Sequence, residues 1–409
     1  MLHNVLWQYA GMPDTLTTGI SPARLAFEMK LAVVGLGQCG GRIADELLRI
    51  QMRTKGLRGF DIVTGAVAVD TDAAALSSLA TIKADEQRRI FISGVGGRGS
   101  TTAGTFSAGA EAMRDEAGRV CALLAREAKH SEADAMMLVS AVAGGTGSGG
   151  APLLARTLKE RFPSVPVYAL LVLPFEHEEA APNVAENSSA CLDSIANIAD
   201  AVILCDNQRY VDNAAVSGPT LQALNRSMLE PLSRLLGAGE GRRGRNVIQE
   251  LSTADLVAVL DGWTAIGGMC TAFSPVSLSR GDFMRRDVRH EQAVRAMSSA
   301  LAAVSFNCRA DDAYKALYLV SGPAKELGTN IGDTMYDCLH QAAPHAILRG
   351  GVMSEKALDV TVVLSNLGEP ERLKRLREKT LQSSEKPLHA YRKSDAELLE
   401  ELGIDIPDL

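Results

Sequence analysis

The chain has 409 residues, more than one ordinary domain, and carries 42 Lys and Arg against 49 Asp and Glu, a net charge of −7. This mild acidity argues against a nucleic-acid-binding face, which needs clustered positive charge. Apolar residues make up 46% and charged residues 22%, which excludes a wholly disordered chain. The seven scattered cysteines are odd in number and favour reduced thiols in a cytoplasm over disulfides or a zinc site.

Two regions were considered as targeting or membrane segments. Residues 1–28 lack the basic start and apolar block of a signal peptide, so we expect an N-terminal extension there. The longest uncharged stretch, at 135–155, contains five glycines and Pro152, whereas a spanning helix needs about 20 uninterrupted apolar residues. We therefore expect no membrane insertion.

From residue 30 onward, short apolar runs alternate with segments of helical spacing. The runs predict strands at 31–34, 62–69, 89–92, 135–142, 165–173 and 201–205. The segments between them predict helices at 43–50, 108–128, 153–160 and 185–198. This alternation is typical of an α/β fold with a parallel sheet covered on both faces.

A long helix is predicted at 218–236, followed by a glycine-rich basic connector at 237–245. The remainder predicts a smaller α+β domain. Its helices are expected near 253–260, 286–304 and 330–342, and its strands near 265–273, 316–319, 346–349 and 358–364. From about residue 381 the chain becomes polar, with a short acidic helix predicted at 395–402.

Two glycine-rich loops each lie between a predicted strand and a predicted helix. The first, Gly35-Leu-Gly37-Gln-Cys-Gly40, matches the dinucleotide fingerprint, although a tight turn gives the same pattern. The second, at 144–152, has five glycines in seven residues, and its Thr146 and Ser148 supply hydroxyls. Glycines let backbone N–H groups approach phosphate, and a following helix adds its positive end. The pair of loops predicts phosphate binding.

The loop pattern excludes a P-loop enzyme, because G-x-x-x-x-G-K-[ST] does not occur in the sequence. Phosphate charge must then be met by backbone N–H groups, hydroxyls and a metal ion. A dehydrogenase needs one such loop and an acid about 20 residues on. Here Asp70 comes about 30 residues after the first loop, and the second loop would have no purpose.

The Gly-Gly-Thr-Gly-Ser-Gly-Gly-Ala-Pro segment at 144–152 resembles the signature of the tubulin/FtsZ superfamily. The opening Met-Lys-Leu-Ala-Val-Val-Gly-Leu-Gly-Gln-Cys-Gly-Gly at 29–41 is similar to that of the archaeal CetZ group. The resemblance covers about 29–375 and implies a parallel-sheet GTPase domain, a central helix and an activation domain. It divides the chain into five regions. These are an extension at 1–28, the GTP-binding domain at 29–217, the central helix with its connector at 218–244, the activation domain at 245–380 and a tail at 381–409.

The resemblance implies GTP or GDP with Mg²⁺ as cofactors and assigns the phosphate contacts. Gln38 would reach phosphate and metal, and Asp72 would approach Mg²⁺ through water. Gly99 lies in the segment similar to the loop that senses the γ-phosphate, where the spacing departs from the family pattern. The other implied phosphate contacts are Gly37, Cys39, Gly144, Gly145, Thr146, Gly147 and Ser148.

The resemblance to the family also implies contacts to the sugar and to the base. Glu178 would bond a ribose hydroxyl, and Asn207 and Asn225 would read guanine. The family usually has an aromatic residue four positions before the second asparagine. This chain has Leu221 there, so plain apolar contact replaces stacking and a looser base specificity is expected.

Hydrolysis in the family needs acids from the next subunit, supplied by the segment after the central helix. Asp255 falls on the second acidic position, but Ser252 falls on the first, and Glu250 is the nearest substitute. Phosphoryl transfer needs a positioned water and charge neutralisation. We expect slow, assembly-dependent hydrolysis. The alternative for Asp255 is a helix-start acid that favours the helix dipole.

The sequence thus predicts a cytoplasmic, tubulin/FtsZ-like GTPase that assembles head-to-tail into filaments and acts in cell shape or division. The tail at 395–409 is a candidate adaptor-binding helix, and no nucleic acid is expected as a partner. The alternative is a GTP-binding regulator or scaffold with little polymerisation or hydrolysis. Ser252 and the N-terminal extension motivate it. The dehydrogenase is the third and least favoured reading.

Overall fold

The computed structural model describes residues 29–58, 61–93, 104–128, 133–212, 220–237, 247–249, 251–271, 282–323, 327, 330–354 and 358–385. Several predictions lie outside the described residues: the extension at 1–28, Gly99, Glu250, most of the connector and the helix at 395–402. Within the described part of the chain, no helix is long and apolar enough to cross a bilayer.

The first half of the chain forms a parallel sheet, as predicted. Its strands are β1 (Leu31–Leu36), β2 (Val63–Asp70), β3 (Arg89–Phe91), β4 (Ala135–Ala141), β5 (Val167–Leu173) and β6 (Ala201–Asp206). They lie in the order β3-β2-β1-β4-β5-β6, and every neighbouring pair is parallel. The runs are almost wholly apolar because the central strands are buried on both faces.

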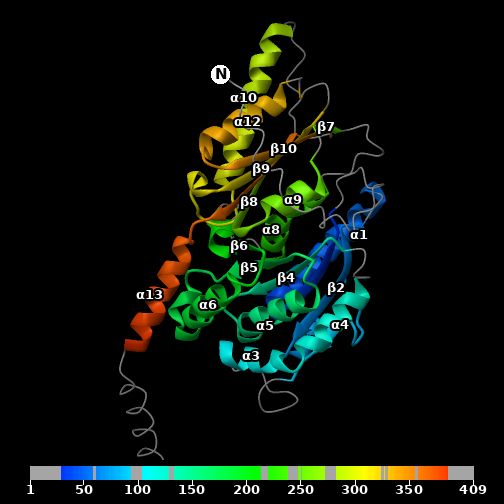
Figure 1. Cartoon of the computed structure of the whole chain (residues 1–409), viewed down its shortest axis with the longest axis vertical. Helices are drawn as coiled ribbons and strands as arrows, with labels where there is room; N and C mark the ends of the chain where they lie inside the picture. The colour runs from blue at the N-terminus through cyan, green and yellow to red at the C-terminus, as the bar shows by residue number, and fades with distance from the viewer. Residues whose placement is uncertain are drawn as a thin grey trace, which may run out of the picture.

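Helices connect these strands across both faces (Figure 1). They are α1 (Gly37–Arg58), α2 (Ala73–Ser77), α3 (Phe106–Arg114), α4 (Ala117–Glu127), α5 (Gly145–Arg161), α6 (Pro182–Ile195) and α7 (Asn207–Asp212). The sequence predicted that these two helices begin several residues after the glycine loops, at 43 and 153. In the structure α1 and α5 begin inside the loops, at Gly37 and Gly145. The loops are therefore the first turns of long helices.

The single helix predicted at 108–128 is wrong, because the structure has two helices, α3 and α4, that end and begin around Asp115 and Glu116. Close contacts at glycines explain the break. A Cβ on Gly109 of α3 would lie 1.9 Å from the carbonyl oxygen of Gly145, and one on Gly65 of β2 would lie 2.7 Å from Ala128. α3 thus packs closely on α5, whereas α4 packs on β2 of the sheet.

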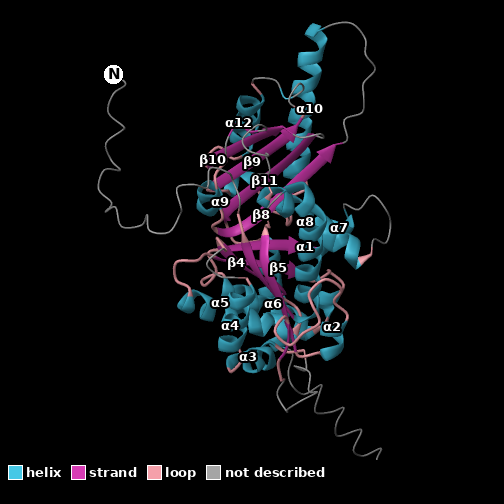
Figure 2. Cartoon of the chain, turned by 90° about the vertical axis from the view of Figure 1, so that its right-hand side faces the viewer, coloured by secondary structure: helices cyan, strands magenta, loops and turns pink. Residues whose placement is uncertain are grey.

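The second half continues the same sheet through a short junction. β8 (Gly262–Thr271) pairs in parallel with β6 over only three residue pairs and then runs antiparallel to β11 (Leu358–Leu367). β9 (Lys315–Gly322), β10 (Ile347–Ser354) and β7 (Val247–Gln249) complete the order β6-β8-β11-β9-β10-β7. The described strands form one 11-stranded sheet. Figure 2 shows its two groups of strands one above the other.

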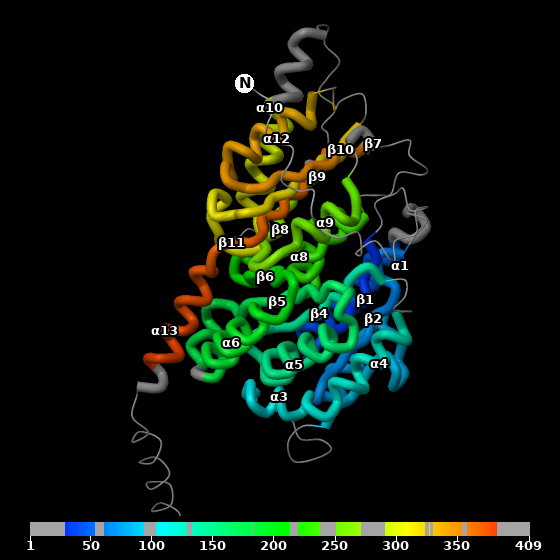
Figure 3. Tube along the Cα trace, in the orientation of Figure 1, coloured from blue at the N-terminus to red at the C-terminus, as the bar shows by residue number. Residues whose placement is uncertain are grey.

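The helices of the second half are α8 (Leu221–Leu236), α9 (Thr253–Val259), α10 (Asp282–Ala302), α12 (Ile331–Ala342) and α13 (Glu371–Glu385). α8 contacts α1 in the first half and β8 and β11 in the second, so it joins the two halves. The sequence prediction missed α13, which crosses the proposed boundary at residue 381. α13 packs along α6, where Figure 3 shows the two side by side.

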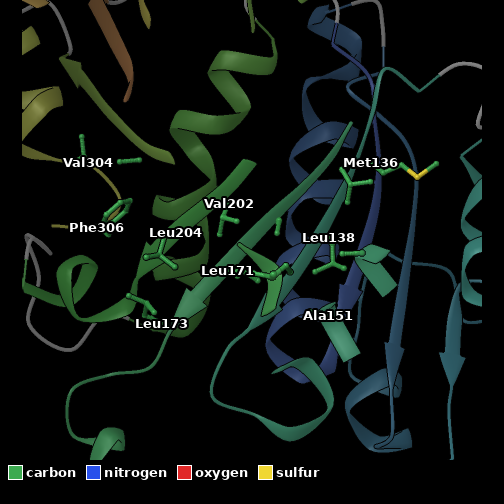
Figure 4. Close-up of a cluster of buried hydrophobic side chains, with 14 of the residues drawn as sticks. Met136, Leu138, Ala151, Leu171, Leu173, Val202, Leu204, Val304 and Phe306 are labelled. Atoms are coloured by element: carbon green, nitrogen blue, oxygen red, sulfur yellow. The ribbon is translucent and has the colours of Figure 1, made fainter. Parts of the chain in front are cut away.

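Two apolar clusters lie on opposite faces of the sheet. One packs beneath α3, α4, α5, α6, α10 and α12, and the other beneath α1, α8 and α9. Figure 4 shows part of the first cluster, where side chains of β4, β5 and β6 meet Ala151 of α5 and lie beside Val304 and Phe306. Only Tyr168 and Tyr318 are aromatic among the largest fully buried side chains, in line with the low aromatic content.

Candidate nucleotide-binding site

A cavity of about 730 Å³ opens at the carboxyl ends of β1, β2, β4, β5 and β6. In open α/β sheets this edge is where ligands bind, since the loops there carry side chains from several strands. Most of the residues assigned to the nucleotide line it together: Gly37, Gln38, Cys39, Asp72, Gly144, Gly145, Thr146, Gly147, Glu178, Asn207, Leu221 and Asn225.

The first turns of two long helices face this cavity. α1 begins at Gly37 and α5 has Gly144 as its N-cap. The first N–H groups of a helix have no partner within the helix, and the helix dipole adds positive charge at that end. Gly37 has a φ of +68°, a conformation that favours glycine, and its position lies against Gly147. Such paired helix starts suit a polyphosphate.

The glycines of the second loop have two different roles. A Cβ on Gly147 would lie 2.4 Å from the Ser140 hydroxyl, and one on Gly149 would lie 1.9 Å from the Phe106 carbonyl oxygen. These two glycines allow protein to pack closely. A Cβ on Gly144 would have nothing within 4 Å, and Gly144 lines the cavity. Its missing side chain therefore leaves space beside the cavity that no protein atom fills, which fits a bound phosphate group.

Ser148 does not line the cavity, unlike the four residues before it, 144–147. It is fully buried, and its hydroxyl lies 3.4 Å from the carbonyl oxygen of Gly145. Its backbone N–H donates to the Gly144 carbonyl oxygen at 2.9 Å. The structure thus places Ser148 behind the loop, within α5.

The segment after β2 joins the second glycine loop through hydroxyl groups. Thr71 Oγ1 lies 2.9 Å from Thr146 Oγ1. Asp70 Oδ1 accepts the N–H groups of Thr71 at 2.7 Å and of Asp72 at 3.2 Å. Burial raises the pKa of Asp70 to about 6, although these two hydrogen bonds oppose the shift. The carboxylate of Asp72 caps α2 by accepting the Ala74 N–H at 2.8 Å.

The sugar-side residue Glu178 begins a short 3-10 helix, η2 (Glu178–Ala180), which leads into α6. Glu178 Oε2 accepts the N–H of Phe175 at 2.8 Å, which closes the turn after β5. The rings of Phe175 and His177 stack with centroids 5.5 Å apart. This loop forms one wall of the cavity.

The base-side residues come from two helices. Asn207 is the first residue of α7, directly after β6, and Asn225 lies on α8. Leu221 begins α8 and is 53% exposed although it lines the cavity. An exposed leucine at this wall offers apolar surface to a flat ligand.

Arg42, Asp70, Thr71 and Phe175 are among the cavity-lining residues that the sequence analysis did not assign to the nucleotide. Arg42 lies four residues after Gln38 on α1, so helical spacing could have placed it on the same side. Thr71 lies between Asp70 and Asp72, two acids that the sequence analysis had considered. Phe175 lies in the Pro174-Phe175-x-x-Glu178 segment that resembles the family's ribose loop, but only Glu178 of that segment was assigned a contact.

Asp255 lies outside the cavity, at the start of α9 in the second half. It forms a capping box with Ser252, whose N–H and hydroxyl both donate to Asp255 Oδ2, at 3.0 and 2.6 Å. Arg349 Nε donates to Asp255 Oδ1 at 3.1 Å. Burial alone would raise the pKa of Asp255, but the bonds from Ser252 and the charge of Arg349 hold it below its usual value. Any catalytic role therefore requires a second subunit.

The donor set tests whether Mg²⁺ fits the site. The described residues contain no group of three or more His, Cys, Asp or Glu that could hold a metal ion. Mg²⁺ commonly keeps several waters and binds through one or two carboxylates with substrate phosphates. The acids after β2 therefore fit a metal held mainly by phosphate and water.

Comparison with known proteins identifies the class that this fold and site define. Residues 30–215 match the family model described as the Tubulin/FtsZ family, GTPase domain. The match spans β1 to β6 and ends just after α7, so it contains both glycine loops. By this match residues 30–215 form a GTPase domain of the Tubulin/FtsZ family.

The chain is also similar to archaeal CetZ proteins. It is 28% identical to the tubulin-like protein CetZ3 of Haloferax volcanii over 394 residues, which cover 91% of this chain and 97% of that protein. The CetZ2 structure from the same organism, described as a GTPγS-bound protofilament, has a TM-score of 0.70 at 27% identity and covers 88% of this chain and 99% of that one. The GDP-bound CetZ1 monomer has a TM-score of 0.71 at 23% identity, covering 87% and 100%.

Proposed function

We propose that this chain binds GTP and GDP in the cavity, assembles head-to-tail into protofilaments and hydrolyses GTP where two subunits meet. One observation carries the proposal. The cavity is lined both by the starts of α1 and α5 and by Asn207, Leu221 and Asn225. A single cavity with groups suited to phosphates and groups suited to a base fits a nucleotide. A role in cell shape or division, within the cytoplasm, is part of the proposal.

Each part of the site has a separate task in this proposal. The N–H groups at the two helix starts and the Thr146 hydroxyl hold the phosphates. Gln38 and Asp72 would hold a magnesium ion, which would supply charge neutralisation at the phosphates. Glu178 holds the ribose, and the two asparagines select guanine. Asp255 of the next subunit orients the attacking water.

The location of Asp255 supports shared catalysis. Its carboxylate lies at the start of α9, away from the cavity of its own chain. A relative described as a GTPγS-bound protofilament supports head-to-tail contact as the arrangement that would bring it to a neighbour's nucleotide. Heterologous contacts of this kind produce open filaments.

Phosphate release, measured with GTP and Mg²⁺ over a range of protein concentrations, tests the proposal. The specific rate should rise with concentration, because each site is completed by a second chain. Asp255→Asn should abolish the rise and leave GTP binding unchanged. Asp333→Asn, an exposed acid in the first turn of α12, is the matched control and should behave as wild type. A specific rate independent of concentration would contradict shared catalysis.

A GTP-binding regulator with little assembly is the second candidate. The capping box favours it, because the Asp255 carboxylate is already engaged by Ser252 and Arg349. Both contacts would have to be released before this acid could orient water. Sedimentation with GTP separates the two candidates, since filaments pellet and a regulator remains in the supernatant. An adaptor that binds the tail at 395–409 is compatible with either.

A further inference from the structure

A buried arginine from α13 contacts both the sugar-side and base-side loops of the cavity. Arg372 lies in the first turn of α13 and is only 6% exposed. Its Nε donates to Glu179 Oε1 at 2.7 Å, and its Nη1 donates to Asp206 Oδ2 at 2.8 Å. Its Nη2 donates to the carbonyl oxygen of Pro174 at 3.0 Å. One planar guanidinium thus fastens the loop after β5 to the last residue of β6.

Each of the three residues that accept these hydrogen bonds is directly connected to the cavity wall. Glu179 follows Glu178, the candidate ribose contact, and Asp206 precedes Asn207, a candidate guanine contact. Pro174 itself lines the cavity. A shift of the arginine would therefore move the backbone that carries both contacts.

The two carboxylates depend on this arginine for their charge balance. Glu179 and Asp206 are each only 8% exposed, and buried ionised groups need a partner. Burial raises the pKa of Asp206, and the positive charge of Arg372 opposes that shift. Glu179 has a second partner, Lys379, also from α13.

α13 has other contacts that hold it on the protein. Leu373 and Leu376 are buried, and Arg377 pairs with Asp193 of α6 and with Glu369. α13 lies along α6 in Figures 1 and 3. Arg372 is thus the contact of this helix that reaches both nucleotide loops, whereas Arg377 holds the helix to its neighbour.

We propose that Arg372 is a positioning residue of the nucleotide site, which makes α13 part of the machinery that recognises ribose and guanine. The inference rests on the proposed function, namely that the cavity binds a guanine nucleotide. It also has a reciprocal consequence. If docked α13 favours nucleotide binding, then bound nucleotide must strengthen the docking of α13 by the same factor.

Binding of fluorescent GTP, competed by GTP, ITP and 2′-deoxy-GTP, tests the positioning role. Wild type should prefer GTP over both competitors. Arg372→Met should weaken GTP about tenfold, equal to about 1.4 kcal/mol, and bring both preference ratios toward one. Arg372→Lys keeps the charge but loses the fork, so it should lie between them. Arg377→Met is the matched control on the same helix and should keep wild-type ratios.

The outcomes separate this inference from the proposed function. No GTP binding by wild type would overturn the proposed function before any variant is compared. Wild-type preference ratios in a folded Arg372→Met would overturn the positioning role. Equal loss of preference in both methionine variants would mean that helix docking alone matters, which also overturns it.

Hydrogen exchange on the wild-type chain provides a test that needs no variant, because removing one partner of a buried ion pair can prevent folding. GTP should slow exchange in the loop at 174–181 and in the first turns of α13, at 371–377. The amides of α4 serve as an internal reference. Protection of the loop without protection of α13 would overturn the proposed coupling.

Discussion

Gly144 and Gly147 lie three positions apart, yet a methyl group has opposite consequences at the two. At Gly147 the methyl would lie 2.4 Å from the Ser140 hydroxyl and 2.8 Å from the Ala141 carbonyl oxygen. At Gly144 it would contact no protein atom. The first position is constrained by packing and the second by the space that a ligand would occupy.

Gly144→Ala should therefore fold normally and lose nucleotide affinity by about tenfold or more, since the methyl occupies the space of a phosphate. Gly147→Ala should lose stability, because the strand that it contacts has to move. Thermal unfolding and fluorescent-nucleotide binding measure the two effects. Equal nucleotide affinity in Gly144→Ala and wild type would contradict the assignment of this loop.

A second prediction concerns the charge of Asp70. Its folded pKa of about 6 lies above the ordinary value of 3.8, because burial disfavours the ionised form. The folded state therefore holds this proton more tightly, and the associated stability, present at low pH, is lost as pH rises through about 6. Both backbone N–H groups donate to the same atom, Oδ1, which an asparagine retains.

Asp70→Asn should thus become more stable than wild type as the pH rises from 4 to 6. The difference in the free energy of unfolding should grow to about 3 kcal/mol. Above that range the difference should level off. Urea unfolding of both proteins at several pH values measures it. A difference that stays constant from pH 4 to pH 7 would show that the folded pKa is ordinary.

Among single residues, the sequence could predict half of the residues that line the cavity, because two glycine loops and two asparagines occupy fixed positions in the motifs. It could not place Ser148 behind the loop, since burial depends on the helix that follows. It also could not find Arg372, whose partners lie more than 160 residues away in the chain.

At the scale of elements, the contact between α3 and α5 depends on glycines. A Cβ on Gly109 would lie 1.9 Å from the carbonyl oxygen of Gly145, at the start of the phosphate-binding helix. Gly118 on α4 is half-buried, and a Cβ there would have only the side chain of Arg161 nearby, at 3.7 Å. The two positions are a matched pair.

Gly109→Ala should separate α3 from α5, lower stability by about 1–3 kcal/mol and weaken nucleotide binding through displacement of Gly145. Gly118→Ala should instead stabilise the chain by about 0.5–1 kcal/mol, because alanine loses less entropy in a helix. Thermal unfolding compares them. Loss of stability in both variants would argue against close packing as the cause.

Helices and strands were predictable where the apolar residues repeat with a clear period. They were less predictable where long-range contacts determine where an element begins and ends. The strands β1 to β6 follow from apolar runs. The division of 108–128 into two helices depends on glycine contacts with other elements, so no local signal marks it. α13 has a charged, weakly patterned sequence, and its stability comes from Leu373 and Leu376 packing against distant residues.

For the whole molecule, the cavity and Asp255 lie in different halves of one chain. This separation predicts complementation between two inactive variants. At a GTP concentration that fills the wild-type site but not the weakened one, Gly144→Ala should hold little GTP but still carry the acid, and Asp255→Asn should bind GTP but lack the acid. In an equal mixture, about a quarter of head-to-tail contacts would combine an intact cavity with an intact acid.

Phosphate release should thus be near zero for each variant alone and recover to about a quarter of the wild-type rate in the mixture. The control is a mixture of Gly144→Ala with a double variant that carries both substitutions, which offers no intact cavity. Recovery absent from the first mixture, with both proteins folded, would favour the regulator over the filament.

The two-part architecture could be predicted because the strand-helix alternation stops near residue 205. After the central helix the pattern changes to that of a smaller α+β domain. The continuity of the sheet could not be predicted. It depends on three residue pairs between β6 and β8, and the pattern of neither strand shows that they are neighbours.

The cysteines offer a practical means of observing assembly. All seven are free, and burial raises the pKa of Cys191, Cys205 and Cys308 to about 12, so these remain unreactive thiols. Cys270, on β8, is the exposed one. A maleimide dye should therefore modify the unaltered chain mainly at Cys270 and at the partly exposed Cys338, both outside the nucleotide cavity. Energy transfer between donor- and acceptor-labelled chains would then report filament growth in real time without any engineered cysteine.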